Sequence, residues 1–414
     1  MMVPMVVSPG LAAPRWMTAW SPDEGARRAR ARLRETLGVD ALRVRSAPAR
    51  LTLVGEFTDF ANGLSLPTVM PHRTFIAATP RTDRVVRIST DHASALGLEA
   101  PVWEGDLDTL DTLVAAGGWM AHPAGVLWSL QERGYSGPGM DMSVVSCIPV
   151  AAGLSSSAAL SAATALVAND LWGLALKADI TAVELAEVCM DAENEVAGGA
   201  SAGLGQHVII RCQPGEALHL DFASPPPTAT ACPLQFAEYG LGLLIINTGQ
   251  IRDSRTVVIR ERMAQAHAAA VALGVDTLRD LHTMPEGRAM IERLGDPVLR
   301  MRARHIYTEN ERVDLVRDEL TGTAPAHERF VAVGKAMYRS HASLETDFEV
   351  SNDALNLAVD TAFRVGALGA RLVGAGGGGV VIALIRRAQA SGAAAQIDAQ
   401  FREQGLPRPA FAFL

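Results

Sequence analysis

The sequence predicts a two-domain protein of the α+β class. Its 414 residues exceed what one ordinary hydrophobic core serves, so two large domains are expected. Segments with the spacing of strands and of helices follow one another without the strict β-α-β alternation of a parallel sheet. Apolar residues make up 49% of the chain and charged residues 20%, which is typical of a globular protein. A net charge of −8, with no long basic run, argues against a nucleic-acid surface.

The first half of the chain contains short strands and two helices. The predicted strands are 50–54, 74–78, 84–89, 140–149, 207–212 and 218–221. The predicted helices are the Ala- and Leu-rich segment 155–174 and the segment 181–196. Thr181 can cap the second helix, because Glu184 follows at capping-box spacing. A proline run at 225–227 is the clearest linker signal, so a domain of residues 21–224 should be followed by one of 225–414.

The second half begins with a strand that looks buried. Its predicted strands are 243–247, 371–374, 380–385 and 410–414, and its predicted helices are 255–273, 327–343, 352–365 and 387–404.

Targeting signals and metal-binding patterns are not evident. No apolar stretch reaches the ~18–20 residues of a membrane span. Residues 1–20 are apolar but broken by prolines and have no basic start, so we expect a loose lead-in and not a signal peptide. The cysteines, Cys147, Cys189, Cys212 and Cys232, form no C-x-x-C pair, so we expect reduced core residues in a cytoplasmic protein.

The first motif is a glycine followed by a serine cluster, Gly153-Leu154-Ser155-Ser156-Ser157. The glycine permits a tight turn, and the serines open a helix whose first N–H groups lack partners. Those donors and the helix dipole suit a triphosphate, and a serine hydroxyl can bind Mg²⁺. The motif alone is equally compatible with a serine-capped helix that binds nothing. It is not a P-loop, because no lysine follows.

The second motif runs from Arg50 to Phe60 and carries Glu56 and Asp59 on a turn after a strand. Two carboxylates placed in this way can accept several hydrogen bonds from sugar hydroxyls. Taken alone, the segment is also compatible with a solvated polar turn.

The third motif lies between two predicted strands and has five glycines within residues 374–379, among them Gly374, Gly376 and Gly377. Such glycines let the backbone approach a ligand or another chain segment closely. A flexible strand connector would show the same composition.

The order and spacing of the three motifs resemble the signature motifs of the GHMP kinases, and residues 50–60 resemble the galactokinase signature. Similarity continues at 191–195, 244–248 and 340–351, and it runs from about Trp16 to the end of the chain. The resemblance implies a ribosomal-protein-S5-like N-terminal domain and an α/β C-terminal domain. It also implies ATP- and Mg²⁺-dependent phosphorylation of an alcohol group on a sugar or sugar-like small molecule.

The resemblance also implies roles for single residues on the nucleotide side. The segment 153–157 matches the loop that wraps the β- and γ-phosphates, and the third motif matches the one that closes over the site. Ser157 and Glu193 match the positions that hold Mg²⁺. The alternative for Glu193 is an exposed charge at a helix end.

On the substrate side, Arg50 matches the arginine beside the reacting hydroxyl. Glu56 and Asp59 match sugar-binding carboxylates, and Ala202 and Gly203 match a substrate-contacting segment.

The substrate side departs from the galactokinase pattern. The catalytic base of galactokinases, an aspartate before a glutamine, is replaced by Gly205, and no acid lies between Glu195 and Glu216. A positioned general base is worth ~10²–10⁴ in rate. The sugar-contacting histidine is Phe57, and a neighbouring tyrosine is Phe60. An asparagine is replaced by Thr52, and a glycine by Ala202.

Three functions are compatible with this pattern. The first is an active kinase whose substrate is a modified sugar or a cyclitol, such as a C7-cyclitol phosphate of natural-product biosynthesis. The second is a regulator that binds sugar and ATP with little or no turnover. The third is ordinary galactokinase activity without the aspartate base, since homoserine kinase and other GHMP members are thought to work without it.

Overall fold

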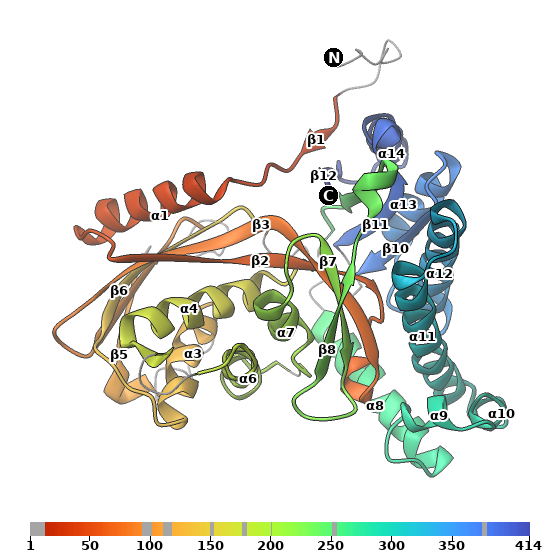
Figure 1. Cartoon of the computed structure of the whole chain (residues 1–414), viewed down its shortest axis with the longest axis horizontal. Helices are drawn as coiled ribbons and strands as arrows, with labels where there is room; N and C mark the ends of the chain where they lie inside the picture. Colours follow the sequence, from red (N-terminus) through yellow and green to blue (C-terminus); the bar gives the residue numbers. More distant parts are fainter. Residues whose placement is uncertain are drawn as a thin grey trace.

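The computed structural model describes residues 13–92, 102–110, 118–149, 153–175, 180–199, 201–250, 255–374 and 379–414. They form one β-sheet of seven strands and one of five, each packed against helices (Figure 1). The α+β class and the two-part architecture are confirmed.

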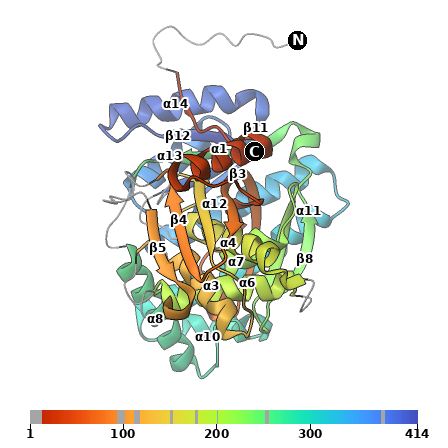
Figure 2. The same cartoon turned by 90° about the vertical axis from the view of Figure 1, so that its left-hand side faces the viewer.

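The seven-stranded sheet has the order β5-β4-β6-β3-β7-β8, and β2 pairs with β3. Its strands are β2 (Arg43–Val54), β3 (Leu64–Pro80), β4 (Val85–Thr90), β5 (Val102–Asp106), β6 (Met140–Ser146), β7 (Glu216–Asp221) and β8 (Thr228–Pro233). Figure 2 looks onto this sheet from the side of β5 and β4. The predicted strands at 50–54, 74–78, 84–89, 140–149 and 218–221 are confirmed, although several have different ends.

Helices cover both faces of this sheet (Figure 1). They are α1 (Pro22–Leu37), α3 (Ala121–Glu132), α4 (Ser156–Trp172), α6 (Ala182–Asp191) and α7 (Leu204–Arg211). On one face, Ala29 and Leu33 of α1 pack against Phe75 and Val145. On the other face, α4 and α7 contact β2 and β3. Thr181 caps α6 as predicted, because its hydroxyl accepts a hydrogen bond from the Glu184 amide at 3.1 Å.

The five-stranded sheet has the order β1-β12-β9-β11-β10. Its strands are β1 (Arg15–Trp16), β9 (Leu241–Asn247), β10 (Gly369–Val373), β11 (Val380–Arg386) and β12 (Ala410–Phe413). Its helices are α8 (Arg255–Leu273), α9 (Asp280–Thr283), α10 (Gly287–Glu292), α11 (Pro297–Thr321), α12 (Ala326–Thr346), α13 (Asp353–Arg364) and α14 (Ala390–Glu403). The predicted strands and helices of the second half are confirmed within a few residues. Within the predicted lead-in, Arg15–Trp16 form β1.

Strand β9 is buried on both faces and separates two cores. Leu243 and Ile245 join the core that reaches the first sheet, while Leu244 and Ile246 join the core beneath α13 and α14. This alternation follows from the two-residue period of a strand. It explains why the segment is apolar throughout.

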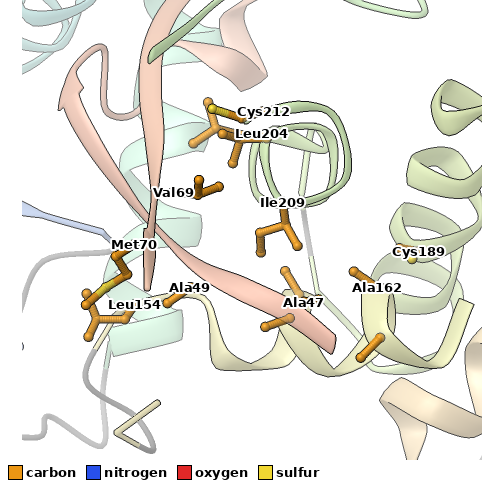
Figure 3. Packing of buried hydrophobic residues seen from close by; sticks show 14 of the residues in the cluster. Ala47, Ala49, Val69, Met70, Leu154, Ala162, Cys189, Leu204, Ile209 and Cys212 are labelled. Carbon is orange, nitrogen blue, oxygen red and sulfur yellow. The ribbon is translucent and has the colours of Figure 1, made fainter. Parts of the chain in front are cut away.

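The strand predicted at 207–212 is wrong, because these residues lie in α7. Its apolar residues are β-branched in part, but Leu204, Val208, Ile209 and Cys212 have helical spacing and are buried. Figure 3 shows Leu204 and Ile209 of α7, and Cys212 just after its end, facing the paired strands β2 and β3 near Val69.

The linker predicted at Pro225–Pro227 is also wrong. The prolines connect β7 to β8, which pair from Glu216↔Pro233 to Asp221↔Thr228 in the first sheet. The chain therefore passes to the second sheet between Pro233 and Leu241, and the boundary predicted at residue 225 falls inside a hairpin.

All four cysteines are unpaired, and three of them are buried, in agreement with the prediction. Among the residues that the structure describes, no helix is both long and apolar enough to cross a membrane.

Candidate active site

A cavity of about 260 Å³ lies where the turn between β2 and β3 meets α4, α7, α8 and the end of β10. It brings together most of the residues that the motifs singled out. Arg50, Glu56, Asp59, Ser155, Ser157, Glu193, Gly205 and Gly374 all line it. Motifs separated by more than 300 residues in the sequence therefore meet at one site.

The other predicted site residues that the structure describes do not line this cavity; they are Gly153, Leu154, Ser156, Ala202 and Gly203. Leu154 is 1% exposed and belongs to the core, so only its backbone is available to a ligand. Ala202 packs against the core, and Gly203 begins α7 with φ +90°. Gly376 and Gly377 fall outside the described residues.

The start of α4 presents backbone rather than side-chain caps. Gly153 has φ +82° and Ser155 has φ +57°, so both adopt the left-handed conformation. The Ser155 hydroxyl makes no capping bond, which leaves the first amides of α4 without a side-chain acceptor. Such a helix start is a ready site for an anion.

Two glycine segments touch beside this helix start. A Cβ added at Gly374 would lie 2.5 Å from the carbonyl oxygen of Gly153, which is closer than any real side chain comes. Only glycine at position 374 lets the end of β10 approach the serine loop this closely.

Glu193 lies in a π-helical turn, η3 (Ala192–Val196), that follows α6. Its Oε2 atom is buried and has no hydrogen-bond partner. The Nδ1 atom of the His122 ring lies 3.4 Å from this oxygen and also lacks a hydrogen bond. A buried carboxylate oxygen without a donor is costly unless something binds it. Together with the Ser157 hydroxyl, it provides oxygen ligands of the kind that Mg²⁺ prefers.

Arg50 and Glu56 form a pair on the opposite side of the cavity. Arg50 Nη1 donates to Thr52 Oγ1 at 2.7 Å and to Glu56 Oε1 at 3.3 Å. The same Glu56 oxygen accepts a hydrogen bond from the Gly374 amide at 2.6 Å. Arg50 Nε is buried without a partner. Glu56 is 4% exposed, so it fixes Arg50 and Gly374 in addition to any contact it makes with a substrate.

Helix α11 holds the turn that carries Glu56 and Asp59. Glu309 Oε1 accepts from the Gly55 amide at 2.7 Å, and Asn310 Oδ1 accepts from the Leu64 amide at 2.7 Å. His305 Nε2 donates to the Glu56 carbonyl at 3.1 Å, because a carbonyl can only accept. These three α11 side chains are fully buried. The sequence interpretation did not identify α11 or these contacts.

Charges around Glu309 keep it ionised. Burial alone would raise its pKa, but the guanidinium groups of Arg312 and Arg371 lower the pKa of Glu309 to about 2. Arg312 Nε donates to Glu309 Oε2 at 2.6 Å. Arg371 is 0% exposed and donates to the Thr52 carbonyl at 3.2 Å.

Asp59 begins a short turn, η1 (Asp59–Ala61), at the edge of the cavity. Burial raises the pKa of Asp59 to about 6, and the nearby Glu56 carboxylate acts in the same direction. The Phe60 amide and Arg50 oppose this shift. Asp59 is therefore mostly ionised at neutral pH and can accept hydroxyl hydrogen bonds.

Gly205 lies in the first turn of α7 and faces the cavity. A Cβ at this position would lie 3.3 Å from Ala158 Cβ and 3.7 Å from Ser155 Oγ. A side chain could therefore be accommodated with a small shift, so packing does not require the glycine.

A second cavity of about 170 Å³ adjoins the first and shares Ser157 with it. Its lining includes apolar and ring side chains of β6, α4, α3 and the residues just before α3, among them Val144, Leu160, His122 and Trp119. The sequence interpretation missed these residues, because they come from separate elements and form no local motif.

Comparisons with known proteins agree with this geometry. Residues 31–80 match the galactokinase galactose-binding signature, residues 121–211 the GHMP kinase N-terminal domain and residues 323–403 the GHMP kinase C-terminal domain. A galactokinase of Streptomyces coelicolor is 35% identical over 382 residues, which is 91% of this chain and 93% of the relative. The chain belongs to the galactokinase family of GHMP kinases.

Further comparisons support this family membership. A galactokinase of Mycobacterium tuberculosis is 34% identical over 82% of this chain and 88% of its own length. The structure of Lactococcus lactis galactokinase complexed with galactose aligns with a TM-score of 0.80 and 26% identity, covering 93% of this chain and 96% of that one. The mevalonate kinase of Methanococcus jannaschii shares the fold, with a TM-score of 0.60 and 15% identity over 90% of this chain and 97% of that one. This member of the galactokinase family is a small-molecule kinase that uses ATP.

Proposed function

We propose that the chain transfers the γ-phosphoryl group of ATP to a hydroxyl of a sugar or sugar-like polyol bound in the 260 Å³ cavity. The observation that carries this proposal is the meeting of two sets of residues in that cavity. The start of α4 and Glu193 suit phosphates and a cation, whereas Arg50, Glu56 and Asp59 suit a polyol.

The proposal places the nucleoside of ATP in the second cavity. Its aromatic and aliphatic lining can take a planar base, and Ser157 marks the point at which the two cavities meet. The triphosphate would then cross the start of α4, with its terminal phosphate facing Arg50.

The proposal assigns Ser157 and Glu193 as the protein ligands of Mg²⁺. Among the described residues, no cluster of three or more metal-ligating side chains exists. This fits a Mg²⁺ ion, which is often bound by one or two side chains together with phosphates and water. Bound there, the ion would neutralise charge on the β- and γ-phosphates.

Arg50 has the central role on the acceptor side. Its guanidinium is held by Thr52 and Glu56 through Nη1, its Nε is buried without a partner, and the residue lines the cavity. It would steady charge near the reacting hydroxyl. Phosphoryl transfer depends mainly on in-line positioning and charge neutralisation, so the glycine at position 205 slows the reaction without removing these terms.

The variant Gly205→Asp tests this account, with Gly205→Asn as a matched control of nearly equal size. If the cavity is otherwise competent for galactose, the aspartate should raise ADP release with galactose by ~10²-fold or more, and the asparagine should not. If the aspartate does not raise ADP release with galactose, the natural substrate is not galactose but a modified sugar or a cyclitol.

A regulator that binds ATP and a sugar is the second candidate, because Gly205 removes the usual base. ADP release measured with a panel of sugars and cyclitols separates the two functions. Stimulated release supports the kinase, whereas tight calorimetric binding of ATP–Mg²⁺ and a polyol without turnover supports the regulator. If no hydroxyl compound stimulates release, the proposed kinase function is refuted.

A further inference from the structure

One wall of the 260 Å³ cavity is apolar. It is formed by Phe57 and Phe60 from the turn after β2 and by Ile259 and Met263 from α8. Ile259 and Met263 are four residues apart and therefore neighbours on one face of the helix. Helix α8 contacts η1, which contains Phe60, so the two pairs adjoin.

Phe57 is fixed in place. Its backbone has φ +63°, a conformation that a bulky side chain adopts only when its surroundings impose it. Its ring centroid lies 4.8 Å from that of Phe348, which in turn lies 4.6 Å from the ring of His305. Phe348 is 0% exposed, and His305 is bonded to the Glu56 carbonyl. The wall is therefore part of the same buried structure that holds the carboxylates.

The four wall side chains offer no strong hydrogen-bonding group. A hydroxyl pressed against them would lose water and gain no partner, which is unfavourable. Arg50, Glu56 and Asp59, which can bind hydroxyls, line the same cavity, and Asp59 adjoins Phe60 in η1. The lining thus combines polar and apolar side chains, and a ligand that fills the cavity must match both.

We infer that the substrate is a polyol ring with one apolar edge, such as a deoxy, methylated or unsaturated position, that lies on Phe57, Phe60, Ile259 and Met263. Its hydroxyls face Arg50 and Asp59. This inference rests on the proposed kinase function and specifies its substrate class.

The experiment compares ADP release by the unaltered protein with galactose and with its 2-, 3-, 4- and 6-deoxy and O-methyl analogues. A hydroxyl against an apolar wall costs about tenfold to hundredfold in kcat/KM. At least one analogue should therefore exceed galactose by about tenfold or more. If no analogue does so while galactose is turned over, this inference is wrong and the kinase function stands. If neither galactose nor any analogue stimulates release, this inference fails, and the kinase function fails with it only if the wider panel of sugars and cyclitols is inert as well.

A pair of variants on α8 tests the wall itself. Ile259→Thr places a hydroxyl in the wall, whereas Val257→Thr makes the same kind of change at a position that is 70% exposed and outside the cavity. Ile259→Thr should reduce the preference for the best analogue over galactose by about threefold or more, and Val257→Thr should leave this ratio unchanged. Equal ratios in the two variants would overturn the inference.

Discussion

The two sides of the cavity are built in different ways. The nucleotide side consists mainly of backbone: left-handed Gly153 and Ser155, the first amides of α4 and the close approach of Gly374. The substrate side consists of side chains on a turn whose backbone is hydrogen-bonded by buried residues of α11. Backbone donors bind any triphosphate and tolerate few changes of conformation. Side chains can be exchanged one at a time, so substrate choice can change while the nucleotide site persists.

The largest effect is expected on the substrate side, from loss of a buried contact of helix α11. The variant Glu309→Ala leaves Arg312 and Arg371 without their buried partner and the Gly55 amide without an acceptor. We expect it to lower the free energy of unfolding by about 3–5 kcal/mol, as for other broken buried pairs. Urea denaturation measures this change.

The control for this prediction is Glu311→Ala on the same helix. Glu311 pairs with Arg288 at the surface and its side chain is 39% exposed, so its loss should cost about 0–1 kcal/mol. If the two variants lose equal stability, the support that α11 gives to the substrate side has been misjudged.

On the nucleotide side, Glu193→Gln removes the proposed Mg²⁺ ligand and retains the shape of the side chain. We expect kcat/KM to fall by about 10²-fold, because charge stabilisation of the transferred group is weakened. Activity should recover in part as Mg²⁺ is raised. Steady-state kinetics across a Mg²⁺ series measures both effects.

Glu195→Gln is the matched control for this prediction, since Glu195 lies in the same π-helical turn but is exposed. A similar loss in both variants would show that the turn, and not the ligand, was disturbed.

The variant Asp59→Asn should expose a conflict between stability and binding. A folded pKa raised to about 6, against the 3.8 of an ordinary aspartate, means that Asp59 lowers stability progressively as the pH rises from about 4 to about 6, and by its full amount above that range. Asparagine has no such cost, so the variant should be more stable by about 1–3 kcal/mol at pH 8 and lose this advantage near pH 4.

Binding should change in the opposite direction. Polyol affinity of the unaltered protein should weaken as the pH falls through about 6, while the asparagine variant should bind weakly with a flat pH profile. Thermal melts and calorimetry across this pH range would measure both effects. A variant that binds as tightly as the parent would exclude Asp59 from the substrate contacts.

The smallest effect is expected for Ser155→Gly. Glycine adopts the left-handed backbone of this position without strain, but it also makes the unfolded chain more flexible, so stability should change by no more than about 1 kcal/mol. Nucleotide affinity, measured by calorimetry, should stay nearly unchanged if the backbone amides are the ligands. A tenfold loss would show that the hydroxyl itself binds phosphate.

The sequence predicted the backbone-built side better than the side-chain-built side. Small residues and serines predict the start of α4 directly, because the local composition determines the turn and the helix. Helix α7 was misread because the three β-branched residues Val208, Ile209 and Ile210 resemble a short strand. Its helical spacing is visible only when Leu204 is included.

Helix α11 was missed for a different reason. Its buried face carries Arg302, His305, Glu309 and Asn310 among the apolar residues, so hydrophobic periodicity is weak. The partners of Glu309 and Asn310 in the turn from Gly55 to Leu64 are about 250 residues away in the sequence, and Arg302 bonds Gln265, Asp347 and Glu349 on other elements. A single sequence contains no local sign of such pairing.

The bond between the Gly374 amide and Glu56 joins the two halves of the molecule at the mouth of the cavity. A hinge motion that parts the two sheets must break this bond while it separates Gly153 from Gly374. Glu56 also holds Arg50, so opening of the mouth would release the arginine from one of its two anchors. Departure of the product and relaxation of Arg50 would then occur in the same movement.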